Sequence, residues 1–302
     1  MASSVRGNLF GEFLGQHRAE LPSQGARPLE SIQKLLLAST AVGTYAVSRY
    51  VLGLLGLPAV PNVSALLLQD QPLYGPLVVL MLTVVLTLLA RPLVGQVRYD
   101  APLFCAVVGL LALPVHGGDV RNALLNSGSP SVYLRMAVEL LILGVAVFLG
   151  YFALYRGADV TTPADMDTIP PAPVDEDSAT DRVAAVAVQT VVTLAILSIL
   201  GQSPLKGQAM FGVALAGGLG AWLTYKTRIV RGSVWYVAGT LLAGLIAYAW
   251  TFFQPEGLPL GDTRGYLAGA ARSLPIHYAT AGVAGTIYGY WAGRSAATPD
   301  VT

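Results

Sequence analysis

Two short stretches of this sequence carry the same charged residues at the same spacing. Residues 118–124 and 261–267 both follow the pattern G-D-x-R-x-x-L, with Asp119 and Arg121 in the first copy and Asp262 and Arg264 in the second. Such an aspartate can cap a short helix with its carboxylate, and the arginine can pair with an acid on another segment. We expect these four side chains to form one cluster, which could either lock two parts of the protein together or line a solute path.

A second group of charged residues lies inside apolar segments. Arg135 and Glu139 are four residues apart, so on a helix they share a face and can pair. Arg49 lies in the first apolar segment and could join Glu139. Charged side chains inside a membrane segment are costly and generally face a protein partner or water. The three residues therefore predict either a structural pair or a polar lining.

Residues for known catalytic or metal chemistry do not occur at suitable spacings. The sequence has no HExxH, no Walker A sequence, no CxxC and no Gly-x-Ser-Gly followed by a histidine in a later apolar segment. The one cysteine, Cys105, lies inside an apolar segment, and no motif supports a metal shared by His116 and His277. We predict no catalytic residue, no metal and no cofactor. An unusual membrane enzyme remains an alternative.

The composition is that of a membrane protein. Apolar residues make up 54% of the chain and charged residues 12%, whereas a soluble domain has roughly 25% charged residues. The apolar residues form runs of about 20, the length that crosses a hydrocarbon core. The net charge of +1 indicates no nucleic-acid partner. We predict an all-α, polytopic integral membrane protein whose partners are the lipid bilayer and a small solute or lipid.

The apolar runs predict about eight transmembrane helices. These spans cover residues 32–57, 73–91, 101–117, 131–155, 182–201, 208–225, 233–253 and 276–293. Twelve of the 18 Lys and Arg residues then fall on the side of the N-terminus and four on the opposite side. Because Lys and Arg are enriched in cytoplasmic loops, both termini are predicted to be cytoplasmic, in a cell (plasma or inner) membrane. Both G-D-x-R-x-x-L loops then lie at the outer face.

The repeated stretch predicts an internal duplication, since the two copies are 143 residues apart and each lies between comparable spans. Two halves of four spans would share one orientation and be related by a pseudo-two-fold axis along the membrane normal. The predicted parts are a cytoplasmic N-terminal segment that could form an amphipathic surface helix (1–31), a first half (32–155), a disordered acidic linker with prolines (156–181), a second half (182–294) and a cytoplasmic tail (295–302).

Small residues recur every four positions in the last span, at Gly285, Gly289 and Gly293. This spacing lets two helices approach closely, so the stripe predicts helix packing, with a pore lining as the alternative. Together, the repeat, the buried charges and the glycine-rich spans favour binding or transport of a small solute or lipid at the interface between the halves. The alternative is a non-catalytic membrane scaffold or assembly subunit.

Overall fold

The computed structural model is a bundle of helices. It describes residues 31–55, 66–68, 74–116, 131–156, 178–201, 206–227, 230, 232–253 and 268–295, and these ranges contain no strand. The prediction of an all-α protein is confirmed. The N-terminal segment, both G-D-x-R-x-x-L loops, most of the acidic linker and the C-terminal tail lie outside the described residues.

Helical structure is present in each of the eight predicted spans. The elements are α2 (Ser31–Leu54), η2 (Leu66–Leu68), α3 (Tyr74–Val94), α4 (Ala101–Gly109), α5 (Ala112–His116), α7 (Ser131–Arg156), α8 (Ala179–Leu200), α9 (Lys206–Thr227), α10 (Ser233–Phe253), α11 (Ala268–Ala271), α12 (Pro275–His277), η3 (Tyr278–Gly282) and α13 (Val283–Ser295). Five helices, α2, α3, α7, α8 and α10, are long and apolar enough to cross a membrane, which indicates a multi-pass membrane protein.

The span predicted at residues 101–117 is divided into two helices. α4 ends at Gly109, and α5 begins only at Ala112. Pro114 accounts for the break, because proline lacks an N–H and its ring clashes with the carbonyl four residues earlier, here that of Leu110. A Cβ at Gly109 would lie 2.9 Å from the backbone of Thr44 in α2. The glycine therefore allows α2 to pack against the end of α4.

Two further boundaries differ from the prediction. α8 begins at Ala179 rather than after the linker, because the Ser178 hydroxyl accepts the Asp181 N–H at 3.1 Å and caps the helix. The last predicted span begins at Pro275 and continues through the π-helical turn η3 and α13 to Ser295. The helical region from α8 to α13 thus begins earlier and ends later in the chain than the apolar pattern indicates.

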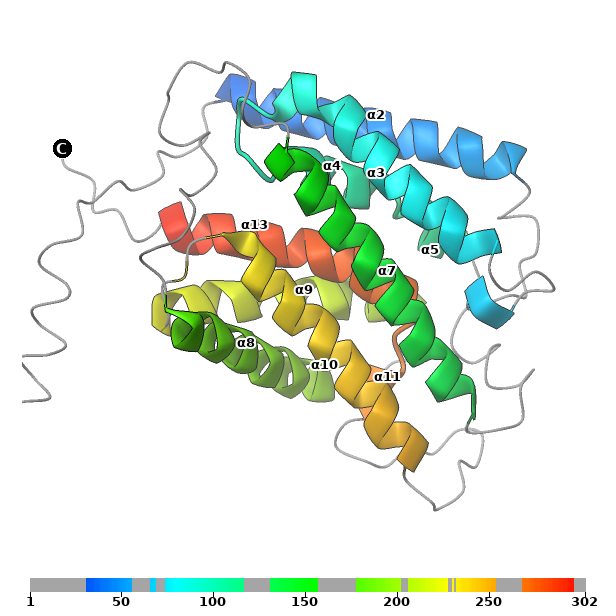
Figure 1. Cartoon of the computed structure of the whole chain (residues 1–302), viewed down its shortest axis with the longest axis vertical. Helices are drawn as coiled ribbons and strands as arrows, with labels where there is room; N and C mark the ends of the chain where they lie inside the picture. Colours follow the sequence, from blue (N-terminus) through cyan, green and yellow to red (C-terminus); the bar gives the residue numbers. More distant parts are fainter. Residues whose placement is uncertain are drawn as a thin grey trace, which may run out of the picture.

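α7 and α10 pack against each other through the middle of the bundle (Figure 1). α3 packs against α7 and α4, and α2 packs against α4. On the other side, α8 packs against α9 and α10, and α13 packs against α9 and α10. The helices before residue 156 therefore meet those after residue 178 mainly through α7 and α10, with additional contact between α4 and α13.

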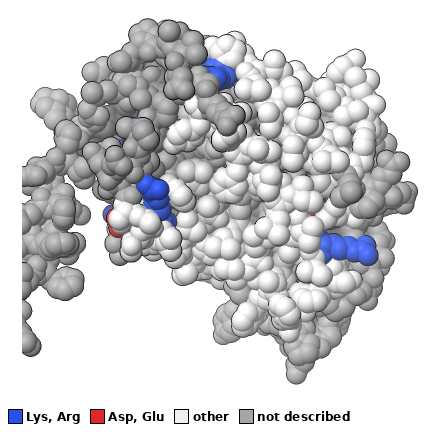
Figure 2. All heavy atoms as spheres, viewed as in Figure 1, with Lys and Arg blue, Asp and Glu red and all other residues white. Residues whose placement is uncertain are grey.

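The outer surface is largely uncharged. Figure 2 shows that most of one face carries neither acidic nor basic side chains, and that the few Lys and Arg side chains in view lie toward its edges. Large apolar side chains are exposed along α2, α3, α7 and α8, among them Val42, Met81, Leu141 and Val191. Such a surface is suited to contact with lipid tails, because these side chains would have no favourable partner in water.

α9 and α13 approach each other closely at their glycines. A Cβ added at Gly289 would overlap the carbonyl of Gly218, and one added at Gly285 would overlap the carbonyl of Ala214. A Cβ at Gly293 would instead meet the Tyr225 side chain at 3.1 Å. Where lipid competes for apolar contacts, small residues allow the close packing that holds two helices together. The backbone contact between α9 and α13 therefore depends on Gly285 and Gly289.

The contact between α9 and α13 predicts different effects of the same substitution at two helical glycines. Gly289→Ala should destabilise the protein by about 1–3 kcal/mol, because the backbones of α9 and α13 must move apart. Gly43→Ala should be neutral or stabilising, because a Cβ at Gly43 meets nothing within 4 Å and alanine favours a helix. Thermal unfolding in detergent measures both effects. Equal melting temperatures would show that the α9–α13 contact is loose.

Candidate functional site

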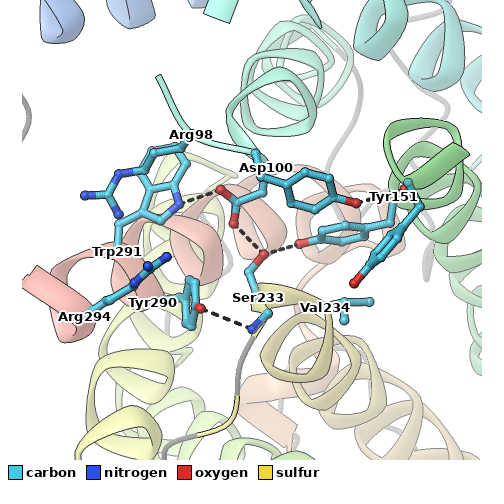
Figure 3. A pocket seen from close by; sticks show the side chains of 11 residues that line it. Arg98, Asp100, Tyr151, Ser233, Val234, Tyr290, Trp291 and Arg294 are labelled. Atoms are coloured by element: carbon cyan, nitrogen blue, oxygen red, sulfur yellow. Dashed lines mark hydrogen bonds between the residues drawn. The ribbon is translucent and has the colours of Figure 1, made fainter. Parts of the chain in front are cut away.

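One buried carboxylate connects four helices. Asp100, directly before α4, accepts a hydrogen bond from the indole N–H of Trp291 in α13 at Oδ1 (2.7 Å) and from the hydroxyl of Ser233 in α10 at Oδ2 (2.5 Å). The Ser233 proton is used in this bond, so the Tyr151 hydroxyl of α7 donates to the Ser233 oxygen, 2.8 Å away. Figure 3 shows these side chains converging between the four helices. We call Asp100, Tyr151, Ser233 and Trp291 the Asp100 cluster.

Local sequence explains why Asp100 and Ser233 can face each other. Asp100 is at the N-cap position of α4, but its side chain makes no capping hydrogen bond to that helix. Pro102, in the first turn of α4, has no N–H that would need a cap. Gly232 has φ of 94°, a conformation that glycine adopts readily, and its N–H donates to the Tyr290 hydroxyl at 3.1 Å. This turn places Ser233 at the start of α10, opposite Asp100.

The surroundings of Asp100 partly compensate its charge. Burial raises the pKa of the Asp100 carboxyl above its usual range, while the hydrogen bonds from Ser233 and Trp291 and the nearby Arg98 oppose that shift. Arg98 lies over the Trp291 ring, with its guanidinium carbon 5.3 Å from the ring centroid. The N-terminal ends of α4 and α10 also favour a negative charge here, because helix dipoles are positive at that end.

The cavity beside the Asp100 cluster is small. Its volume is about 40 Å³, enough for one or a few water molecules. The residues that line it include the members of the Asp100 cluster, Tyr99, Tyr290 and two arginines, Arg98 and Arg294. Because both carboxylate oxygens of Asp100 already accept hydrogen bonds, the arrangement is suited to holding helices together rather than to binding a large polar molecule.

A much larger groove lies between α4–α5, α9 and α13, with a volume of about 790 Å³. Its floor is the glycine contact between α9 and α13, and its walls include Phe104, Phe211 and Trp222. No charged side chain lines it among the described residues. Phe104 also packs against Trp291, with ring centroids 5.1 Å apart. The groove wall and the Asp100 cluster are therefore joined through this aromatic pair.

The predicted pairing of Glu139 with Arg135 or Arg49 is not formed within the described structure. Glu139 is fully buried, and its Oε2 accepts the N–H of Leu67 in η2 at 3.0 Å, while its Oε1 has no hydrogen-bond partner among the residues that the structure describes. Arg135 and Arg49 are both exposed. The physical reason is that Glu139 faces the interior, where the Leu67 N–H takes the place of a basic partner, whereas Arg135 and Arg49 lie on the exposed surface.

The remaining predicted site residues fall in different places. Asp119, Arg121, Asp262 and Arg264 lie outside the described residues, so their clustering stays a prediction. His277 is buried, and its Nδ1 accepts the Leu274 N–H at 3.2 Å; the side chain of His116, at the end of α5, is not among those described. In the described part of the chain, no three His, Cys, Asp or Glu side chains are close enough together to hold a metal.

Sequence reasoning also missed a polar network among α8, α9, α10 and α13. The Gln189 amide donates to the Thr240 hydroxyl (2.9 Å) and the Gly217 carbonyl (3.2 Å), and its oxygen accepts from Thr224 (3.1 Å). Thr240 and Thr286 are hydrogen-bonded at 2.8 Å. The only available signal was polar residues within apolar runs, which often hydrogen-bond between helices in membranes. The network is internally satisfied and therefore structural.

Comparisons with protein-family models, with curated proteins and with solved structures find no match for this chain. The arrangement of its own residues is therefore the basis for assigning a function.

The raised pKa of Asp100 predicts a pH dependence of stability. At pH values between the pKa of an unfolded aspartate, about 3.9, and the higher pKa of Asp100 in the folded state, the folded protein binds more protons than the unfolded protein. This contribution is fully present below the unfolded value and is lost as pH rises through the folded value. The free energy of unfolding of the wild type, compared with Asp100→Asn, should therefore fall as pH rises through this window. Chemical denaturation at several pH values measures the difference. A difference that is constant or rises with pH would contradict a raised pKa of Asp100 in the folded state.

Proposed function

We propose that this protein is an integral membrane protein that binds a lipid in the groove between two four-helix halves. The observation that carries the proposal is the 790 Å³ groove bounded by α4–α5 on one side and by α9 and α13 on the other. This volume is typical of sites for small ligands, which are mostly apolar. Because no charged side chain lines it among the described residues, an acyl chain fits it better than a polar solute does.

The packing pattern supports the two halves and the eight spans. α3 packs against α7 as α9 packs against α13, and α2 packs against α4 as α8 packs against α10. Between the proposed halves, α7 meets α10 and α4 meets α13. A two-fold axis that relates the spans in order would exchange the members of these pairs, as expected for a parallel repeat. The extensive contact between α3 and α4 has only a slight counterpart between α9 and α10, so the two halves have diverged in their packing. In this arrangement, α4–α5, α9 and α12–α13 complete the eight spans.

Passage of a polar solute between the halves has less support. The polar cavity at that interface has a volume of about 40 Å³, and the Asp100 carboxylate next to it is hydrogen-bonded to protein groups. A scaffold is the second candidate function, because small residues such as Ala214, Gly218 and Gly285 along the floor of the groove are also those that accept a partner's transmembrane helix.

The lipid proposal predicts that filling the groove prevents acyl-chain binding. Two variants add a bulky side chain to the groove. Leu215→Trp changes a half-buried residue in the middle of the groove, and Ala292→Trp changes an exposed residue at one end. The matched control is Val191→Trp, on the outer face of α8. Each protein is placed in lipid nanodiscs with a phospholipid that carries a photoreactive group on its acyl chain. Mass spectrometry then measures cross-linking to α9 and α13.

Cross-linking should be strong in the wild type and the control, and it should fall to background in both groove variants. The melting temperature of each variant is measured to verify that it is folded. Equal cross-linking of the folded groove variants and the control would contradict lipid binding and favour the scaffold.

We also infer that both termini lie in the cytoplasm, since twelve of the 18 Lys and Arg residues are then on that side. The test uses two single-cysteine variants in a Cys105→Ala background. Thr180→Cys, near the start of α8, and Ser131→Cys, at the start of α7, place exposed thiols on sides of the membrane that are predicted to be opposite. A membrane-impermeant maleimide added to intact cells should label position 131 and leave position 180 unlabelled until the cells are lysed. The reverse pattern would overturn the orientation.

A further inference from the structure

We propose that the lipid in the groove is an anionic phospholipid whose phosphate binds at Lys226, at the C-terminal end of α9. This inference rests on the proposed lipid-binding function and adds the chemical class of the headgroup and the end of the groove that holds it. It follows from three features: the direction of the groove along α9, the position of Lys226 one turn beyond the groove on the same face of that helix, and the basic residue at the same end of α13.

The groove follows one face of α9 for most of the length of that helix. Its lining on α9 runs from Gly207 through Phe211 and Gly218 to Trp222, at the spacing of three or four residues that defines one helix face. At 1.5 Å per residue, this face is about 22 Å long. An extended chain lying along it would thus cross most of a hydrocarbon core roughly 30 Å thick, and its polar end would reach one end of α9.

Lys226 continues the face that lines the groove. It is four residues beyond Trp222, so it lies one turn farther along the same face of α9. Trp222 is 37% exposed, and Lys226 is exposed as well. A tryptophan followed by a lysine is typical of the level at which a helix leaves the lipid tails and meets the headgroups. A phosphate at this level would be within reach of the Lys226 ammonium group.

The same end of the groove is the basic end of α13. Arg294 lies two residues beyond Ala292, the last groove residue of α13. Basic residues grouped at a membrane surface attract anionic lipids. This charge complements a phosphodiester with a neutral headgroup substituent better than a zwitterionic phosphocholine.

The lysine at the opposite end of α9 has a structural function. Lys206 donates a hydrogen bond from Nζ to the carbonyl of Val115 at 2.8 Å, close to the end of α5, where helix carbonyls lack partners within the helix. Lys206 therefore joins α9 to α5. The two lysines of α9 lie at opposite ends of the groove face, which provides a matched pair for an experiment.

The experiment measures lipid selectivity with spin-labelled phosphatidylglycerol and spin-labelled phosphatidylcholine that carry the same labelled acyl chain. Electron paramagnetic resonance of the protein in liposomes gives the fraction of each probe immobilised by the protein. The wild type should prefer phosphatidylglycerol. Lys226→Gln should reduce that preference by about fivefold, the factor expected for one basic residue at an anionic surface, and should leave phosphatidylcholine binding unchanged. Lys206→Gln should keep the preference.

The outcomes separate this inference from the function on which it rests. An unchanged preference in Lys226→Gln, or a loss of preference in Lys206→Gln alone, would overturn the headgroup assignment while leaving acyl-chain binding intact. If Leu215→Trp releases neither probe, the groove is not the lipid site and the proposed function itself fails. Raising the salt concentration should weaken the phosphatidylglycerol preference of the wild type, because salt screens the interaction of exposed charges; a preference insensitive to salt would contradict a charge interaction.

Discussion

The buried carboxylate of Asp100 is the interaction on which the central part of this structure depends. It joins α4 to α10 through Ser233 and to α13 through Trp291, and Tyr151 extends the connection to α7. A buried charge without such partners would be unfavourable, so these helices are constrained to meet at one point. One turn into α4, Phe104 packs against the same tryptophan. The groove wall is thus connected to the hydrogen bonds of Asp100 through Trp291.

The groove also depends on the glycines that form its floor. Because α9 and α13 touch at the backbone, they form a floor rather than a ridge, and the larger side chains beside them, such as Phe211 and Tyr288, form its sides. The same small residues therefore stabilise the bundle and create an apolar hollow. Polar groups in the second part of the chain, such as Gln189, instead hydrogen-bond to one another. This separation of polar and apolar surfaces favours an apolar ligand.

The sequence was sufficient to predict the class of fold and the positions of the helices, because apolar runs of the required length identify membrane helices directly. It did not predict the break between α4 and α5, where the effect of Pro114 was overlooked. Nor did it predict the Asp100 cluster, whose members are separated by up to 191 residues and meet only in the folded bundle. Helical spacing suggested that Glu139 pairs with Arg135, but spacing on one helix does not reveal that η2 supplies a backbone N–H at that depth.

An experimental structure of the protein in nanodiscs that contain phosphatidylglycerol tests the central claim most directly. The account predicts elongated density along the face of α9 that runs from Gly207 to Trp222, enclosed by Phe104 and the glycines of α13, with headgroup density next to Lys226. A groove that is closed by movement of α4 against α9, or filled by another segment of this chain, would contradict the claim that the interface between the halves is a lipid site.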